Sequence, residues 1–425
     1  MSTILDNDKE YIWHPFTPLK GMPDPLPIVK AEGAYLYTES GQKILDAVSS
    51  WWVNLHGHAH PNIVKAIAEQ AATLEHVIFA GFTHKPATEL AKKLVSIFPE
   101  GIKKVFYSDN GSTSVEVALK MAIQYWFNKG IEKKRIIAFE GAYHGDTFGS
   151  MSVGDRSVFS MPFQPYLFEV TFLPFPTIDN REEVINLLSQ TLEKGDVAAC
   201  IYEPLVQGAS GMRIYPQEIL DEVIHLAKQH QALCIADEVM TGFGRTGKLF
   251  ASEYLSLPPD IICVSKGITG GFLPLGVTAC SVEIIHAFDT ADTLKTFYHG
   301  HSYTANPIAC AAALASFDLL VSEETQSKIQ EIADSHRNWA ETVKNHPKVV
   351  KVECLGTILV IEINTGEGSS YFSEIRTKIY PYFLSKNILL RPLGNTIYCM
   401  PPYCITKEEL NTIYSEINAF LATLH

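Results

Sequence analysis

The stretch ALCIADEVMTGFGRTG at residues 232–247, followed by DIICVSKGITGGFLPLG at residues 260–276, decides the expected fold. Each of these two segments contains a short apolar run near its start, and charged residues follow the run. Asp237 and Glu238 follow the first run, and Lys266 follows the second. Apolar runs of this length are typical of strands buried on both faces of a mostly parallel sheet. Open α/β sheets bind their ligands at the carboxyl ends of such strands. The stretch therefore predicts an α/β domain with a site built on an acid and a lysine.

Similar patterns on both sides of this stretch extend the predicted sheet. Further strands are expected at 104–108, 135–140, 198–205 and 277–281, and helices at 114–129 and 217–231. Strands that alternate with helices indicate a central sheet with helices on both faces.

The two ends of the chain have a different texture. The first 60 residues are rich in proline, glycine and aromatic side chains and are expected to be irregular. After residue 305 the pattern predicts long helices, a pair of antiparallel strands at 349–363, a strand within 396–402 and a last helix from Thr406. We expect an N-terminal segment (1–58) that packs with the small domain, a large domain (59–315) and a C-terminal small α+β domain (316–425).

Composition excludes several classes of function. The 425 residues carry a net charge of −13, which argues against nucleic acid or an anionic membrane surface as partner. No stretch approaches 18 apolar residues, and the polar N-terminus MSTILDNDKE does not resemble a signal peptide. The eight cysteines form no CxxC pair, so free thiols are expected. These features predict a soluble cytoplasmic protein without a membrane partner.

A lysine at the end of a buried strand has a specific chemical use. Burial lowers the pKa of an ammonium group, and a Schiff-base lysine must lose its proton to react. An aspartate that pairs with a pyridinium nitrogen is the second requirement of pyridoxal phosphate. Lys266 and Asp237 supply both, although Asp237 alone is equally consistent with a salt-bridged structural acid.

The same cofactor needs a phosphate site, and the segment SDNGSTSVEVALK (108–120) offers one. Gly111, Ser112 and Thr113 lie between a predicted strand and a predicted helix, where backbone amides at a helix N-terminus bind anions. Helix N-capping explains the hydroxyl residues equally well when this segment is considered alone.

Two motifs suggest other chemistry. GFGRTGKL (242–249) fits G-x-G-x-x-G and most of a Walker A loop, but Leu249 replaces the required Ser or Thr and no long helix follows. A glycine-rich loop without a phosphate role is the alternative. HGHAH (56–60) has metal-like histidine spacing, but a glycine-containing turn is the preferred interpretation, and no metal is expected.

The combination resembles a known family. The motifs that carry the likeness are WHPFT (13–17), SSWWVNLHGHAHP (49–61), EGAYHGDTFGSMSVG (140–154), EPLVQGASGM (203–212), DEVMTGFGRTG (237–247), SKGITGGFLPLG (265–276), HGHSYTANPIACAAA (299–313) and RPLGNTIYCMPPY (391–403). They are similar to class III aminotransferases, which are fold type I pyridoxal-phosphate enzymes. Within that family they follow, nearly end to end, the branch that aminates 8-amino-7-oxononanoate in biotin biosynthesis. The resemblance implies a homodimer with shared active sites.

The resemblance also implies roles at the cofactor. Lys266 would bind it covalently and carry protons, and Asp237 would pair with its ring nitrogen. Gly111 and Ser112 would hold the phosphate. The other implied contacts are Tyr143 and Val239 on the two ring faces, Gln207 near the ring hydroxyl, and Gly300, His301 and Ser302 reaching the site of the neighbouring subunit.

For the substrates, the resemblance implies a channel walled by Trp51 and Trp52, with Arg391 binding a carboxylate. Tyr398 and Asp146 are expected nearby. Core packing for the tryptophans, a salt bridge for Arg391 and helix capping for Asp146 are the alternatives.

The amino donor depends on two departures from the family pattern. Phe16 stands where many relatives that use S-adenosylmethionine have tyrosine, and Gly300-His301-Ser302 stands where they have G-P-T. Both differences resemble the branch that uses lysine. Because Tyr398 and the tryptophans are kept, S-adenosylmethionine is the expected donor and lysine the alternative. Another ω-amine or ornithine-type substrate is a further alternative.

Overall fold

A seven-stranded sheet forms the centre of the larger part of the molecule. The computed structural model describes residues 3–366 and 373–424. The strand order is β4 (Ile102–Ser108), β12 (Gly276–Ser281), β11 (Ile261–Val264), β10 (Leu233–Asp237), β7 (Val197–Tyr202), β5 (Arg135–Phe139) and β6 (Thr171–Leu173). Only β12 runs antiparallel to its neighbours. The predicted α/β fold with a mostly parallel sheet is confirmed.

Alternate residues of these strands pack against helices on opposite faces. Leu233 and Ile235 of β10 join the cluster formed with α5 (Gly111–Asn128), whereas Cys234 and Ala236 join the cluster formed with α7 (Arg181–Leu192) and α8 (Gln217–Gln229). Both faces are therefore dry, which explains the continuous apolar runs in the sequence. The remaining large helices around this sheet are α3 (Pro61–Thr73), α4 (Lys85–Ile97), α7 (Arg181–Leu192), α8 (Gln217–Gln229), α9 (Val282–Phe288) and α10 (Pro307–Leu320).

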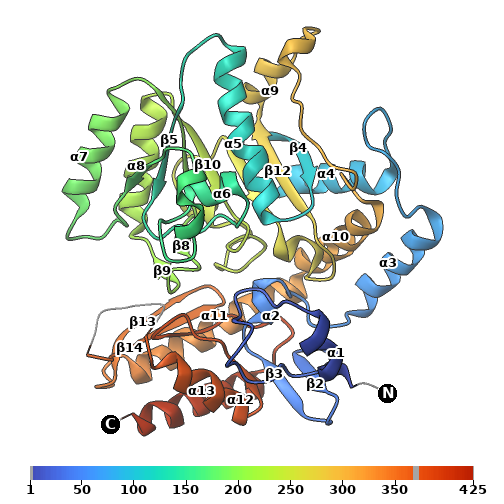
Figure 1. The fold of residues 1–425 in the computed structure, drawn as a ribbon, viewed down its shortest axis with the longest axis vertical. Helices are drawn as coiled ribbons and strands as arrows, with labels where there is room; N and C mark the ends of the chain where they lie inside the picture. Colours follow the sequence, from blue (N-terminus) through green and yellow to red (C-terminus); the bar gives the residue numbers. More distant parts are fainter. Residues whose placement is uncertain (1–2, 367–372, 425) are drawn as a thin grey trace.

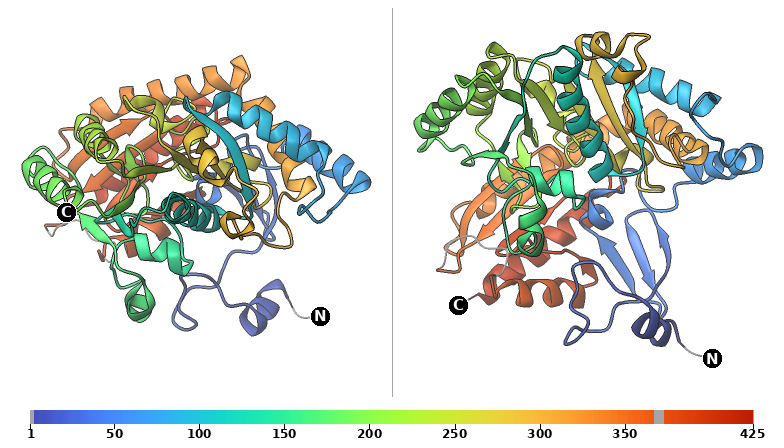
Figure 2. Two further views of the ribbon diagram at one scale, coloured as in Figure 1. Left: turned by 90° about the horizontal axis from the view of Figure 1, so that it is seen from above. Right: turned by 45° about the horizontal axis from the view of Figure 1, so that its top comes forward.

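The N-terminal and C-terminal segments lie together below the large sheet (Figures 1 and 2). One small sheet is antiparallel, in the order β13 (Val349–Leu355), β14 (Ile358–Ile363) and β16 (Thr396–Cys399). The other contains β1 (Ile28–Glu32), β2 (Tyr35–Thr38), β3 (Lys43–Asp46) and β15 (Ile388–Leu389). Helices α11 (Glu323–Val343), α12 (Arg376–Ser385) and α13 (Lys407–Thr423) accompany them.

The expectation of an irregular N-terminal segment was wrong. Residues 4–11 form helix α1 (Ile4–Tyr11), and β1 to β3 form a sheet with β15. These strands have four or five residues each, and β1 is largely exposed, so they lack the apolar runs that mark the central strands. The partner of β3 lies near the other end of the sequence, where local patterns cannot indicate it.

The proposed domain boundary falls inside a helix. Residue 315 lies within α10, which packs on α3 and α4, whereas the next helix, α11, packs on β13 and β14. The division into 1–58, 59–315 and 316–425 stays a prediction, and we propose the turn between α10 and α11 as the break.

The structure also bears on membrane spans and on the state of the cysteines. Within residues 3–366 and 373–424, no helix combines the length and apolarity that a membrane span requires. All eight cysteines are free, and Cys200 and Cys263 are buried, as expected from the apolar runs that contain them.

Candidate active site

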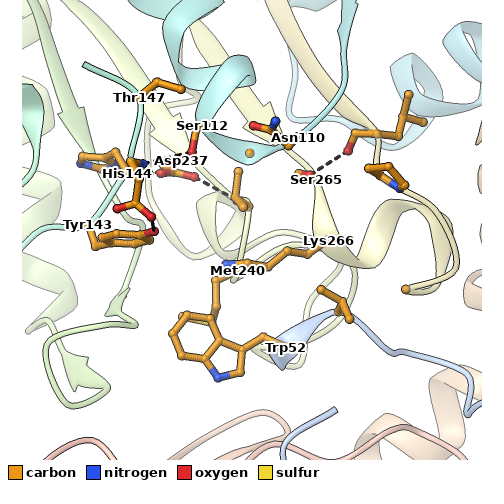
Figure 3. Close-up of a pocket in the computed structure, with 18 of the residues that line it drawn as sticks. Trp52, Asn110, Ser112, Tyr143, His144, Thr147, Asp237, Met240, Ser265 and Lys266 are labelled. Atoms are coloured by element: carbon orange, nitrogen blue, oxygen red, sulfur yellow. Dashed lines mark hydrogen bonds and ion pairs between the residues drawn. The ribbon is translucent and has the colours of Figure 1, made fainter. Parts of the chain in front are cut away.

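A cavity of about 660 Å³ opens at the carboxyl ends of β10 and β11 and continues into a wider one of about 1140 Å³. Trp52, Tyr143, Asp146 and Lys266 line both, so the two spaces form one continuous site. Figure 3 shows Lys266 extending across this space above the ring of Trp52.

Lys266 follows β11 and begins the short 3-10 helix Lys266–Thr269. Its φ of 48° is strained for a residue other than glycine, and such strain is frequent at functional positions. Its Nζ lies 4.7 Å from the centroid of the Trp52 ring. Desolvation in the cavity lowers the pKa of Lys266 to about 8, although the nearby carboxylates of Asp237 and Glu203 oppose the shift. At neutral pH the ammonium form still predominates, but the neutral, nucleophilic amine is far more abundant than for a lysine of ordinary pKa.

Asp237 ends β10 and is held by two partners. Its Oδ1 accepts the backbone amide of Val239 at 3.1 Å, and its Oδ2 lies 2.7 Å from His144 Nδ1. An ionised carboxylate only accepts hydrogen bonds, so His144 Nδ1 carries the proton in this pair. The arrangement keeps a negative charge at the cavity, where a cationic ring nitrogen would find its partner.

Glu203 is a third carboxyl group in the cavity, and sequence reasoning gave it no role. It follows β7 and accepts the backbone amides of Tyr143 at 3.0 Å and Gly208 at 2.9 Å. Burial raises the pKa of Glu203 to about 7, and the charge of Asp237 adds to this. The signal that could have found it is the strand-end rule that found Asp237, because AACIYE also ends an apolar strand in an acid.

The N-terminus of α5 faces the same cavity through Gly111 and Ser112. An added Cβ on Gly111 would lie 2.7 Å from Val239 Cγ1, so glycine permits this close approach. Ser112 Oγ accepts the amide of Asp146 at 3.2 Å. Thr113 belongs to a capping box: its amide donates to Asn110 Oδ1 at 2.9 Å, and its hydroxyl accepts the amide of Asn110 at 3.1 Å. The capping interpretation therefore holds for Thr113. The exposed amides of this first turn suit a phosphate.

These groups fit pyridoxal phosphate by their chemistry. A helix N-terminus for the phosphate, an aspartate for the ring nitrogen and an amine of lowered pKa for the aldehyde all face one cavity. Val239 and Tyr143 line the same space.

Tyr143 and Asp146 are joined at the junction of the two cavities. The Tyr143 hydroxyl donates to Asp146 Oδ2 at 2.9 Å, and burial raises the pKa of Tyr143 well above its ordinary value. Helix α6 (Phe148–Val153) has Thr147 as its N-cap, so capping does not account for Asp146.

Aromatic side chains form the wall opposite the sheet. Trp52 Nε1 donates to the Tyr398 hydroxyl at 2.9 Å, and Trp51 meets Phe16 edge to face with ring centroids 5.8 Å apart. Trp51 is 43% exposed, which rules out a core role for it, and Phe16 lines the wider cavity beside it. The guanidinium of Arg391 lies 5.1 Å from the Trp51 ring centroid at the exposed edge of this wall.

Six of the expected site residues line neither cavity: Arg391 and Tyr398, described above, and Gln207, Gly300, His301 and Ser302. Gln207 is buried, and its amide bonds Glu140 O at 3.0 Å and the guanidinium of Arg213. Gly300 and Ser302 are exposed and His301 is half-buried on the surface. Their assigned roles stay predictions.

The two alternative motifs have structural explanations. In GFGRTGKL, Arg245 is buried, and the loop leads into the short 3-10 helix Ala251–Tyr254 rather than a long helix. In HGHAH, His56 bonds the Ser316 hydroxyl, and burial lowers its pKa to about 3, while His58 bonds Asp46. Within the described part of the chain, no three His, Cys, Asp or Glu side chains gather as a metal site would require.

Comparisons with known proteins agree with this geometry. A curated relative from Synechococcus elongatus, adenosylmethionine-8-amino-7-oxononanoate aminotransferase, is 51% identical over 415 residues, covering 96% of this chain and 97% of its own. The crystal structure of the enzyme of that name from Methanocaldococcus jannaschii superimposes with a TM-score of 0.92 at 37% identity and 98% coverage of both chains. A PLP-bound amine transaminase from an uncultivated Pseudomonas species gives a TM-score of 0.91 at 29% identity, over 97% of this chain and 98% of its own.

The family model described as aminotransferase class-III matches residues 19–421, which is nearly the whole chain. That span contains Lys266, Asp237 and the N-terminus of α5, the groups that converge on the cavity. The chain belongs to the class III aminotransferases.

Proposed function

We propose that the protein transfers an amino group, by means of pyridoxal phosphate, to 8-amino-7-oxononanoate and so makes the 7,8-diaminononanoate of biotin biosynthesis. The observation that carries the proposal is the convergence of Lys266, Asp237 and the first turn of α5 on one cavity. The relatives that share this chain's full length are named for the same acceptor. When bound, the cofactor supplies the electron sink for proton removal at the substrate carbon.

In this proposal Lys266 has two tasks. Its amine, with a pKa of about 8, would hold the cofactor through the aldehyde and would move a proton at the substrate carbon. Asp237 would hold a proton on the ring nitrogen, and its hydrogen bond to His144 fixes the carboxylate in place. Gly111 and Ser112 would hold the phosphate through amides of the α5 N-terminus.

Tyr143 and Val239 would enclose the ring from its two sides and exclude water from the reacting atoms. Tyr143 is held by its hydrogen bond to Asp146, and Val239 is held by the hydrogen bond that its backbone amide donates to Asp237. Both side chains are therefore positioned before the substrate arrives, which lowers the entropic cost of reaction.

The acceptor's carboxylate would meet Arg391 beside Trp51, while Trp51 and Trp52 pack along its apolar chain. We expect Arg391→Ala to raise the KM for the keto acid roughly 10- to 100-fold, the loss expected for a charge-assisted pair, with little change in kcat. Steady-state kinetics with varied acceptor measures this. Arg181→Ala, which breaks an exposed ion pair with Glu222, is the matched control. An unchanged KM would remove the role assigned to Arg391.

The donor is tested on the cofactor-loaded enzyme in single half-reactions. We expect S-adenosylmethionine to discharge the absorbance band of the lysine-bound cofactor and lysine to leave it unchanged. Discharge by lysine alone would identify lysine as the donor and support the significance of Phe16. If neither compound acts and simple ω-amines do, the acceptor assignment fails while the transaminase chemistry stands.

We further propose that the working enzyme is a homodimer with shared sites. Gly300, His301 and Ser302 lie at the surface and line neither cavity of their own chain, so a role at an active site requires a second copy. Gln207 would act on the ring hydroxyl only after its amide turned away from Glu140 O.

A further inference from the structure

The four-residue segment that carries both tryptophans, α2 (Ser49–Trp52), has a strained backbone. Ser49, Ser50 and Trp52 have φ values of 51°, 62° and 68°. Ser50 combines its positive φ with a ψ of −69°, and Trp51 follows at φ −149° and ψ 60°. Conformations of this kind are common only for glycine, and they persist elsewhere only where the surroundings over-determine them.

Asp46, fully buried at the end of β3, holds the first half of this segment. Its Oδ1 accepts the amide of Val48 at 3.2 Å. Its Oδ2 accepts both the amide of Ser50 at 2.7 Å and the Ser50 hydroxyl at 3.2 Å. One carboxylate oxygen thus fixes the residue whose backbone is most strained.

A histidine completes the hydrogen bonding of this carboxylate. Asn54 Oδ1 accepts the amide of Gly57, which turns its Nδ2 toward His58 Nδ1 at 3.1 Å. His58 Nδ1 is therefore an acceptor, so its proton lies on Nε2, which donates to Asp46 Oδ2 at 2.9 Å. His58 completes this arrangement in its neutral form.

Arg245 holds the second half of the segment from the opposite side. Its guanidinium, 1% exposed, donates to the carbonyl oxygens of Asn54 at 2.9 Å, Trp52 at 3.5 Å and Pro401 at 2.9 Å. Among the described residues it has no carboxylate partner, and the ring of Tyr403 lies 5.2 Å away. A buried cation that bonds only carbonyl groups joins the tryptophan segment to the chain that follows Tyr398.

We propose that Asp46 and Arg245 are positioning residues that together orient Trp51 and Trp52 for recognition of the keto-acid acceptor. The inference rests on the proposed function, because it assumes that this wall contacts the acceptor. Trp52 lies against Lys266 Nζ and bonds Tyr398, and Trp51 lines the wider cavity. Release of either end of the segment lets its backbone relax and moves both rings, while Lys266, Asp237 and the α5 N-terminus stay in place.

Asp46→Asn tests the first half of the proposal. Both carboxylate oxygens accept hydrogen bonds, and an amide has only one acceptor oxygen. Whichever way the new amide turns, its NH2 group faces a donor, either the Val48 amide or the Ser50 and His58 donors, so one side of the hydrogen bonding is lost. We expect the KM for the keto acid to rise roughly 10- to 100-fold, because a small displacement of a binding wall has an effect of this size. The kcat and the absorbance band of the lysine-bound cofactor should be retained.

A second substitution separates positioning from general stability. Glycine adopts the Ser50 conformation without strain, so the double variant Asp46→Asn/Ser50→Gly is expected to recover most of the lost acceptor affinity. Asp260→Asn is the matched control, because Asp260 accepts a backbone amide and a lysine at the amino-terminal end of β11, away from the wall. Its acceptor KM should stay at the wild-type value.

Arg245→Lys tests the second half, since an ammonium group cannot reach all three carbonyl oxygens, and the same rise in KM is expected. Unchanged KM values in both Asp46→Asn and Arg245→Lys would overturn the proposal, as would an equal rise in Asp260→Asn or no recovery in the double variant.

A measurement without substrate keeps this test independent of the proposed function. Both proteins are compared in a Trp13→Phe background, which removes a tryptophan that is 78% exposed. Acrylamide should quench the tryptophan fluorescence of Asp46→Asn more strongly than that of the protein with Asp46, because Trp52 becomes accessible. Wild-type enzyme that makes no diaminononanoate with any donor would refute the proposed function alone. Unchanged quenching would refute the positioning role alone.

Discussion

Replacement of Lys266 by alanine is expected to lower kcat by at least about 10⁴-fold, because one side chain supplies both the covalent attachment and the proton transfer. Nothing near it can substitute, since the other ionisable side chains that line the cavity offer no second primary amine; they are Tyr143, His144, Asp146, Glu203 and Asp237. Single-turnover and steady-state rates with the keto acid measure the loss.

A chemical readout accompanies the rate. Borohydride should fix the cofactor covalently to the wild-type chain and fail to do so in Lys266→Ala, whose phosphate and ring-nitrogen groups remain. Lys248→Ala is the matched control, because Lys248 is exposed and its ammonium contacts the carbonyl of Glu253 and the ring of Tyr254, neither of which lines the cofactor cavity. Turnover near the wild-type rate in Lys266→Ala would refute the assignment of this lysine.

Asp237→Asn is expected to lower kcat roughly 10²- to 10³-fold, the size of effect seen when one preorganised electrostatic partner is removed. The amide has nearly the shape of the carboxylate but no charge to keep a proton on the ring nitrogen. The KM for the acceptor should change little, since Asp237 lies at the far side of the cavity from the tryptophan wall, as Figure 3 shows for Trp52.

Asp196→Asn provides the comparison for this variant, because it removes an aspartate that pairs with Arg135 outside the cavity. Cofactor affinity, measured by fluorescence titration, should fall in Asp237→Asn and stay constant in Asp196→Asn. A kcat within a factor of about three of wild type in Asp237→Asn would exclude the proposed charge pairing.

The central sheet and the cofactor-binding part of the site follow from local patterns in the sequence. Strands β10 and β11 are continuous apolar runs, and parallel strands place their carboxyl ends at one edge. That rule alone brings Asp237 and Lys266 together, and the strand-to-helix junction adds Gly111 and Ser112. Glu203 obeys the same rule but was left without a role, because only the structure shows its amide partners.

Features that depend on distant segments could not be predicted in this way. β3 takes its parallel partner from residues 388–389, and Arg245 finds its acceptors at Trp52, Asn54 and Pro401. Neither pairing leaves a periodic signal, so the N-terminal strands and the purpose of the arginine in GFGRTGKL emerge only from the folded chain.

The bond between Trp52 and Tyr398 joins residues 346 positions apart, and it has a consequence for synthesis. Every strand of the large sheet lies within the first 281 residues, so all of them are synthesised long before the partners of the tryptophan wall. Closing so long a loop is entropically costly and slow compared with the local contacts of the large sheet. The nascent chain should therefore form its cofactor pocket first and its acceptor pocket last. It becomes able to select a substrate only when translation ends.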